Sequence, residues 1–263
     1  MTRITRTILL ALLLAAAQIQ AADLPDTGQD TCYNDSAADS VAASNPASIA
    51  RDAGTHPRQD CRYGRDPAAA AGVLTKTGAG AKGLDYTKIA NNGTTLAASA
   101  ALGSTPPDWA CTKDNITGLT WEVKTTSGLR NNASTYTWYN SNAATNTGNA
   151  GTASGGACSG GTGCDTEKFV ADVNAAHLCT YTDWRMPTQR ELLTLVLADG
   201  SVPSIDPTYF PNTQASYPSY FWSGSSYVPN PPGAWVVNFH DGGTGAGTKS
   251  LTYYVRLVRG GQF

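Results

Sequence analysis

The alternation of apolar and polar residues becomes regular only from about residue 84 onward. Residues 84–89, Leu-Asp-Tyr-Thr-Lys-Ile, predict a strand. The following Asn92-Gly93 predicts a tight hairpin turn, because both central positions of such a turn need positive φ. Residues 94–96 are the expected return strand. Residues 109–123 alternate around a polar turn and predict a second hairpin.

The middle of the chain predicts two helices. Phe169, Val173 and Ala176 are spaced so that they share one face of a helix, with Asp165 or Thr166 as its N-cap. Before them, residues 140–163 are almost entirely Asn, Gly, Ala, Ser and Thr, which predicts a long surface loop.

The second helix begins with a capping box, in which Thr188 is the N-cap and Glu191 follows three residues later. Leu192, Leu195 and Val196 form its apolar face. We expect Asp199-Gly200 to end it.

The last part of the chain predicts strands again, at residues 220–223, 234–239 and 253–259. Loops rich in Gly and Pro at 228–233 and 241–247 separate them. Strands, two helices and then a cluster of strands with long loops give an α+β class of twisted antiparallel sheets.

The N-terminus predicts export. Residues 1–22 contain a basic start, a short apolar stretch and small residues before a polar segment, which is typical of a signal peptide cleaved after Ala21 or Ala22. Residues 23–83 are poorly patterned and are expected to form an irregular arm, ahead of a domain at 84–263. No later stretch is apolar enough to span a membrane.

Charge narrows the possible partners. The 18 basic and 20 acidic residues include Arg3 and Arg6, so cleavage of the signal leaves a net charge of about −4. This balance argues against a broad nucleic-acid-binding surface.

The six cysteines all follow the predicted signal peptide, and an even number in an exported chain indicates disulfides. Six cysteines allow 15 pairings, which spacing alone does not resolve. We expect the pairs Cys32–Cys61, Cys111–Cys179 and Cys158–Cys164. No Cys-x-x-Cys pair occurs and the three histidines are scattered, so no metal and no cofactor are expected.

An ordered series of motifs in the last 160 residues resembles one known family. The motifs are Asp114-Asn115-Ile116-Thr117-Gly118-Leu119-Thr120-Trp121-Glu122, Asp183-Trp184-Arg185-Met186-Pro187-Thr188, Ile205-Asp206-Pro207, Phe221-Trp222-Ser223, Trp235-Val236-Val237-Asn238-Phe239 and Tyr254-Val255-Arg256-Leu257-Val258-Arg259. Over about residues 107–263 the chain resembles the Lcl C-terminal domain family of bacterial exported proteins. The resemblance implies a C-type-lectin-like fold, stabilised by disulfides and used for binding.

The resemblance also implies possible ligands. Many lectins of this fold hold sugar through calcium with Glu-Pro-Asn or Gln-Pro-Asp and then Trp-Asn-Asp, and this chain has neither sequence. A known member of the family is a collagen-like adhesin that binds sulfated glycosaminoglycans, but no Gly-x-y repeat is present here.

Candidate ligand-binding residues are basic or aromatic side chains in loops, together with the polar end of one strand. Basic groups available for an anionic glycan are Lys124, Arg130, Lys249, Arg256 and Arg259. From these and from the loop aromatics and the strand end, the ligand-binding candidates are Arg130, Tyr139, Tyr217, Tyr227, His240, Asp241 and Lys249.

Asp183-Trp184-Arg185 could hold an acidic ligand, but we favour a structural role. In that interpretation Trp184 fills the core and Arg185 pairs with a carboxylate from elsewhere, Glu122 or Asp206. We expect the same structural role for Pro187, Glu191, Trp222, Trp235, Phe239 and Arg256.

The sequence therefore predicts an exported, non-catalytic binding module for a glycan or surface polymer in the periplasm, outside the cell or on the surface of a Gram-negative bacterium. One alternative is an assembly subunit of a pilus, fibre or envelope complex with protein partners, for which oligomers are possible. Another is an enzyme like the formylglycine-generating enzymes, which use cysteines for oxidation. A glycosidase built on Asp206, Asp183 and Glu122 is disfavoured, because no carboxylate spacing supports it.

Overall fold

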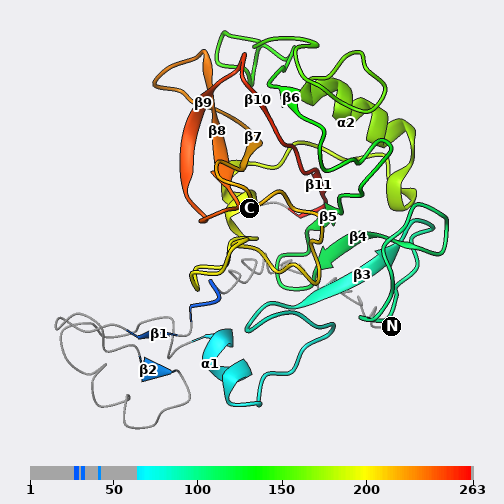
Figure 1. Ribbon diagram of the computed structural model, residues 1–263, viewed down its shortest axis with the longest axis vertical. Coiled ribbons are helices and arrows are strands. Elements are labelled where there is room, and N and C mark those ends of the chain that lie inside the picture. The colour runs from blue at the N-terminus through cyan, green and yellow to red at the C-terminus, as the bar shows by residue number, and fades with distance from the viewer. Residues whose placement is uncertain (1–26, 30, 33–40, 43–63, 262–263) are drawn as a thin grey trace, which may run out of the picture.

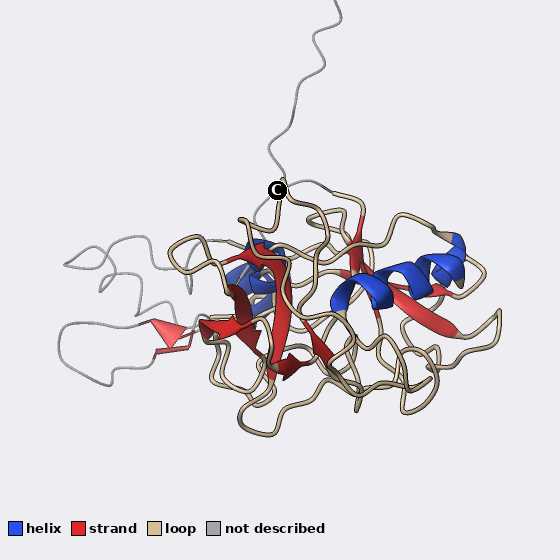
Figure 2. Ribbon diagram, turned by 90° about the horizontal axis from the view of Figure 1, so that it is seen from above, coloured by secondary structure: helices blue, strands red, loops and turns tan. Residues whose placement is uncertain are grey.

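The structure is a computed structural model that describes residues 27–29, 31–32, 41–42 and 64–261. The predicted signal peptide lies outside these residues, as does Cys61, the expected partner of Cys32. A short antiparallel pair, β1 (Thr31–Cys32) and β2 (Val41–Ala42), is the first regular structure in the described residues. Figure 1 shows the order of elements, and Figure 2 shows that loops connect relatively few helices and strands.

One antiparallel sheet holds four strands in the order β11-β5-β4-β3. They are β3 (Tyr86–Ala90), β4 (Trp109–Asp114), β5 (Thr120–Glu122) and β11 (Val258–Arg259). The predicted hairpin at 109–123 is confirmed, because Cys111 pairs with Glu122 and Lys113 with Thr120. The expected return strand at 94–96 was wrong, since only one isolated bridge, Ile89 to Thr95, forms there.

The other main sheet is antiparallel in the order β7-β8-β9, with β7 (Tyr220–Ser226), β8 (Gly233–Asn238) and β9 (Thr244–Thr248). Residues 241–247 were expected to be a loop, but most of that segment is the edge strand β9. Gly247 explains the difference. A Cβ there would lie 2.6 Å from Cε2 of Tyr253 and 3.0 Å from the Trp222 ring, so only glycine fits this close approach.

The predicted strand 253–259 divides into two short strands. β10 (Thr252–Tyr253) pairs with β6 (Tyr136–Thr137), whereas β11 pairs with β5. Between them, Val255 and Leu257 pack into one apolar core and Tyr254 packs against the other, and Figure 1 shows this red segment running between the two sheets.

Both predicted helices are present. α2 (Thr166–Ala175) begins at Asp165, whose side chain accepts a hydrogen bond from the Lys168 N–H. α3 (Gln189–Leu193) has the predicted capping box of Thr188 and Glu191. It ends well before Asp199-Gly200, because tighter bonds, from Leu195 N–H to Leu192 O and from Val196 N–H to Leu193 O, replace the α-helical pattern.

Regular structure also occurs in the segment that the sequence left irregular. α1 (Arg65–Ala70) is fastened to the domain by Arg65 Nε, which donates to Gly83 O at 2.7 Å, and by Asp66 Oδ1, which accepts from Gly83 N at 2.6 Å.

Two apolar cores hold the sheets together. Trp138, Phe169, Trp184 and Trp222 lie in the core that contains α2. The second core lies beneath α3 and includes Trp121, Phe210, Phe221 and Phe239. The structure is thus an α+β domain with antiparallel sheets and few helices.

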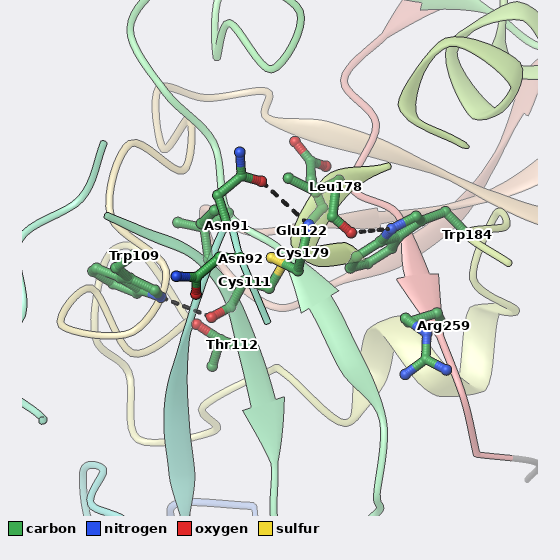
Figure 3. The surroundings of a disulfide bond; sticks show 12 residues. Asn91, Asn92, Trp109, Cys111, Thr112, Glu122, Leu178, Cys179, Trp184 and Arg259 are labelled. Carbon is green, nitrogen blue, oxygen red and sulfur yellow. Dashed lines mark hydrogen bonds between the residues drawn. A yellow bond between two sulfur atoms is a disulfide. The ribbon is translucent and has the colours of Figure 1, made fainter. Parts of the chain in front are cut away.

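Two predicted disulfides are confirmed. Cys111–Cys179 joins β4 to the 3-10 turn η3 (Leu178–Thr180), and Cys158–Cys164 closes a short loop before α2. Figure 3 shows Asn91 and Trp184 beside the first bridge, where Asn91 Oδ1 accepts from Cys179 N at 3.2 Å and Trp184 Nε1 donates to Leu178 O at 3.0 Å.

Candidate functional site

The Asp183-Trp184-Arg185 motif is a structural joint. Arg185 forms a bidentate pair with Glu191, with Nη1–Oε2 and Nη2–Oε1 distances of 2.8 and 2.6 Å. Its backbone bonds to Val258, so the motif attaches β11 to the first turn of α3. Neither expected partner, Glu122 or Asp206, was correct. Glu191 is the partner because its capping-box position places its carboxylate next to Arg185.

The other two residues of the motif also make contacts within the domain. Trp184 is buried, and Asp183 pairs with Arg259 at 2.7 Å between Oδ1 and Nε. Pro187, Trp222, Phe239 and Arg256 are buried, as a structural role requires. Trp235 is only half-buried, because its cross-strand neighbour is the small Ala246.

The five basic candidates, all among the described residues, do not form an exposed patch. Arg130 is 7% exposed, and its guanidinium donates to Ala110 O, Val123 O and Gly103 O. Arg256 is fully buried beside the Phe210 ring, and burial lowers its pKa to about 10. Arg259 lies 3.6 Å from the centre of the Tyr181 ring. The expectation that these cations face an anionic ligand is therefore not met.

Lys124 belongs to the same buried group. Its Nζ lies 3.0 Å from Glu122 Oε1 and 4.5 Å from the centre of the Phe169 ring. Burial lowers the pKa of Lys124 to about 8, although the Glu122 charge opposes this shift. The cation is thus a core group rather than a contact for solvent or ligand.

Lys249 is also internal, with 2% of its surface exposed. Its Nζ lies 4.0 Å from the centre of the Trp138 ring and donates to Asn146 O at 3.0 Å and Asn149 O at 2.6 Å. These carbonyls belong to the long polar loop at 140–163, which has few apolar side chains of its own. Lys249 therefore fastens this loop to the domain.

We expect Lys249→Met to loosen this loop while keeping the aliphatic packing. Two carbonyls lose a charged donor, which costs about 1–3 kcal/mol in the free energy of unfolding. Amide hydrogen exchange should accelerate in residues 140–152. Lys113→Met, at an exposed position of β4, is the matched control and should leave exchange in the loop unchanged. Equal exchange in the two variants would contradict the role assigned to Lys249.

Three predicted ligand residues meet at one end of the β7-β8-β9 sheet. A cleft of about 260 Å³ there is lined by Tyr217, Tyr220, Asn238, Asp241 and Tyr253, among others. His240 packs edge-on against Tyr217, with ring centres 5.4 Å apart, and its Nδ1 lies 2.7 Å from Ala215 O. His240 thus holds Tyr217 at the mouth of the cleft, where the tyrosine is 68% exposed.

Strand alternation builds the floor of this cleft. Tyr220 pairs with Asn238 across β7 and β8, and Val236 pairs with Gly245 across β8 and β9, so these residues share one face. Gly245 leaves that face open. A Cβ on Gly245 would have only the Val236 Cγ2 atom near it, at 4.0 Å.

Tyr253 closes the cleft from β10. Its ring centre lies 5.2 Å from that of Tyr220 and 4.7 Å from that of Trp222. Burial, together with the neighbouring Tyr220, raises the pKa of Tyr253, so its hydroxyl stays neutral at physiological pH. Tyr253 therefore presents a neutral ring to the cleft.

Asn238 supplies a directed donor. Its Oδ1 accepts hydrogen bonds from Ser219 N at 3.1 Å and His240 N at 3.0 Å. Because both bonds engage the oxygen, the amide NH₂ is turned away from these two N–H groups. In the described part of the chain no protein group accepts a hydrogen bond from this NH₂ group, although Asn238 is 97% buried.

Asp241 adds a carboxylate to the rim. Its Oδ1 accepts from Gly243 N at 2.9 Å, which fixes the turn between β8 and β9. The side chain is exposed, and within the described ranges no lysine, arginine or histidine forms an ion pair with it.

Sequence reasoning missed Tyr253, Asn238 and Gly245. The Thr-Gly-Ala-Gly-Thr run of β9 carried a usable signal, because glycine at alternate positions leaves one face of a strand bare. No sequence pattern indicates that Tyr253 lies close to Tyr220.

Two other predicted candidates lie elsewhere. Tyr227 packs edge-on against Trp235 with ring centres 5.0 Å apart. Tyr139 is half-buried, and its backbone exchanges hydrogen bonds with the Thr166 hydroxyl. Neither side chain lines the cleft between Tyr217, Tyr220 and Tyr253, which we call the tyrosine cleft.

A larger groove of about 370 Å³ lies over η3, between the loops at 102–104 and 125–130. None of the described residues in its walls is aromatic, and Arg130 within it is already bonded to three carbonyls. The tyrosine cleft is therefore the better candidate for ligand recognition, despite its smaller volume.

The carboxylates considered for acid–base chemistry are dispersed. Glu122 is buried, Asp183 is paired with Arg259, and Asp206 Oδ2 accepts from Ala81 N. Across the described ranges, no group of three or more His, Cys, Asp or Glu residues is placed to hold a metal ion. The four cysteines between residues 64 and 261 are all in disulfides.

The profile of one protein family, the Lcl C-terminal domain, matches residues 110–259. The chain belongs to this family. Its Lcl C-terminal domain begins in β4 and ends in β11, so it includes the β7-β8-β9 sheet, the four-stranded sheet apart from β3, the two described disulfides and the tyrosine cleft. No curated protein and no solved structure matches the chain. None of the described helices is both long and apolar enough to cross a membrane.

Proposed function

We propose that this Lcl C-terminal domain is an exported, non-catalytic carbohydrate-binding module with a C-type-lectin-like fold, and that sugar binds in the tyrosine cleft. Its antiparallel sheets, few helices and long loops support the fold assignment. Its disulfides support export, because such bonds persist in oxidising compartments.

The observation that carries the proposal is the grouping of Tyr217, Tyr220 and Tyr253 around the Asn238 amide. The C–H face of a sugar packs well on an aromatic ring, and its hydroxyls need directed donors and acceptors. The cleft is slightly smaller than pockets for drug-sized ligands, which enclose about 300–1,000 Å³. It therefore suits one sugar unit of a longer polymer.

No catalytic step is part of the proposal. The described lining of the cleft holds a single carboxylate, Asp241, whereas hydrolysis of a glycosidic bond ordinarily uses two. Binding affinity would come from ring stacking and hydrogen bonds at loops that the disulfides hold in place.

We expect Gly245→Val to weaken sugar binding at least tenfold without unfolding the domain. The valine side chain would occupy the cleft, and the nearest atom to its Cβ is 4.0 Å away, so the strand can accept it. Binding would be measured on a glycan array of the oxidised protein, with calcium and with chelator, followed by calorimetry of the positive ligand.

Thr248→Val is the matched control, because it places the same side chain on the same strand outside the cleft. It should bind as the wild type does. If Gly245→Val retained full affinity while the array identified a ligand, the tyrosine cleft would not be the binding site.

One observation favours the assembly alternative. β9 is an edge strand without a charged residue or proline, and such edges can pair with a strand from another chain. Absence of any glycan ligand, together with concentration-dependent association in sedimentation velocity, would support this alternative over the lectin.

A further inference from the structure

The lining of the tyrosine cleft is acidic. Among the described residues that line the cleft, Asp241 is the charged one, and none is a lysine or arginine. The basic residues that could have offered positive charge to a ligand are committed elsewhere, as Arg130 and Lys249 illustrate. A sulfate or carboxylate group entering the cleft would therefore meet a carboxylate and no compensating cation.

The aromatic groups favour the opposite charge. The rings of Tyr220 and Tyr253 are inclined at 59° with centres 5.2 Å apart, and Tyr217 stands at the mouth. Tyrosine faces attract ammonium groups, and several rings combined with a carboxylate form a site typical of such cations. Aromatic rings, a carboxylate and the free Asn238 amide are thus complementary to a hydroxylated ligand with a protonated amine.

Asp241 is available for this role. Its Oδ1 is held by Gly243 N, which fixes the direction of the side chain, while Oδ2 has no hydrogen-bond partner among the described residues. An exposed carboxylate that is already oriented by its own turn loses little conformational entropy when it pairs with a ligand cation.

We infer that the cleft selects amino sugars with a free, protonated amine and disfavours sulfated glycans. The inference rests on the proposed carbohydrate-binding function and specifies its ligand. The sugar ring packs on the tyrosines, its hydroxyl groups meet the Asn238 amide, and its ammonium group pairs with Asp241.

Calorimetry with three oligosaccharides of equal length tests this inference. We use a glucosamine oligomer, its N-acetylated form, which has the same backbone without the charge, and a sulfated glycosaminoglycan fragment. The glucosamine oligomer should bind about five- to tenfold more tightly than the acetylated one. The preference should decline with added salt and as the pH rises through the pKa of the sugar amine.

Asp241→Asn keeps the acceptor for Gly243 N and removes only the charge. It should equalise the affinities for the glucosamine and N-acetylated oligomers. Asp172→Asn, at a half-buried position of α2 outside the cleft, makes the same change in net charge and should keep the preference.

Equal binding of the two oligomers by the wild type, or tightest binding of the sulfated fragment, would overturn the inference and leave carbohydrate binding intact. Binding of none of the three, with no other glycan found on the array, would instead refute the proposed function. A short lysine-containing peptide is a further arm of the experiment. If it bound as tightly as the glucosamine oligomer, the site would recognise protein amines and the amino-sugar assignment would be wrong.

Discussion

Replacing Cys111 and Cys179 together with alanine should lower the free energy of unfolding by about 4 kcal/mol. The two cysteines are 68 residues apart, and a cross-link that closes so long a loop strongly restricts the unfolded chain. The bridge also holds an unusual turn, in which His177, Cys179 and Thr180 adopt φ values of 50°, 52° and 71°. Such left-handed conformations are costly for non-glycine residues and persist only where the surroundings impose them.

The Cys158–Cys164 bridge provides the control. It spans only 6 residues, so its removal by the same alanine substitutions should cost about 2 kcal/mol. Urea unfolding of the oxidised proteins measures both values. A reductant should bring the wild type below both variants, and an equal or reversed order of the two losses would contradict the chain-entropy argument.

Arg185→Ala should destabilise the domain by roughly 2–3 kcal/mol. The substitution leaves the Glu191 carboxylate, which is 2% exposed, without its cation. This loss of stability is smaller than for a fully buried pair, because Arg185 is itself partly exposed and Glu191 keeps its hydrogen bond from Thr188 N. Asp183→Ala breaks the more exposed pair with Arg259 and should cost less than about 1 kcal/mol.

The cost of Arg185→Ala should depend on pH. Burial by itself would raise the pKa of Glu191, but the hydrogen bonds from Arg185 and Thr188 outweigh it and lower the pKa below its usual value. A carboxyl with a depressed pKa in the folded state stabilises the protein above its unfolded pKa, and this stability is lost as pH falls through the folded pKa.

The difference between wild type and variant should therefore be largest near neutral pH and should shrink below about pH 4.5. Chemical unfolding at pH 7 and pH 4 measures the change. A difference that is constant over this range would show that Arg185 acts through packing rather than through its charge.

Local physical chemistry made part of this structure predictable. The capping box of Thr188 and Glu191 and the N-cap Asp165 satisfy backbone groups within three residues, so the sequence shows them directly. The hairpin at 109–123 follows from strict alternation. The family motifs likewise indicated the Lcl C-terminal domain.

The candidate site was predictable only in part. His240 and Asp241 were expected at a ligand-binding rim because they follow a predicted strand, and Tyr217 was expected as an exposed loop aromatic. The structure places the three together. Arg130 and Lys249 were expected to contact an anionic glycan and are internal instead. A lysine or arginine has the same local pattern whether it faces solvent or donates to distant carbonyls, so its burial depends on which loops the fold brings near it.

By itself, the sequence determined the helix starts, the hairpin and the family, since these depend on groups close together along the chain. Only the tertiary structure decided that Glu191 rather than Glu122 or Asp206 pairs with Arg185, that β9 forms an edge strand, and that Tyr253 meets Tyr220 to form the cleft. These outcomes depend on the packing of segments from different parts of the chain, where shape and charge must match across space rather than along the sequence.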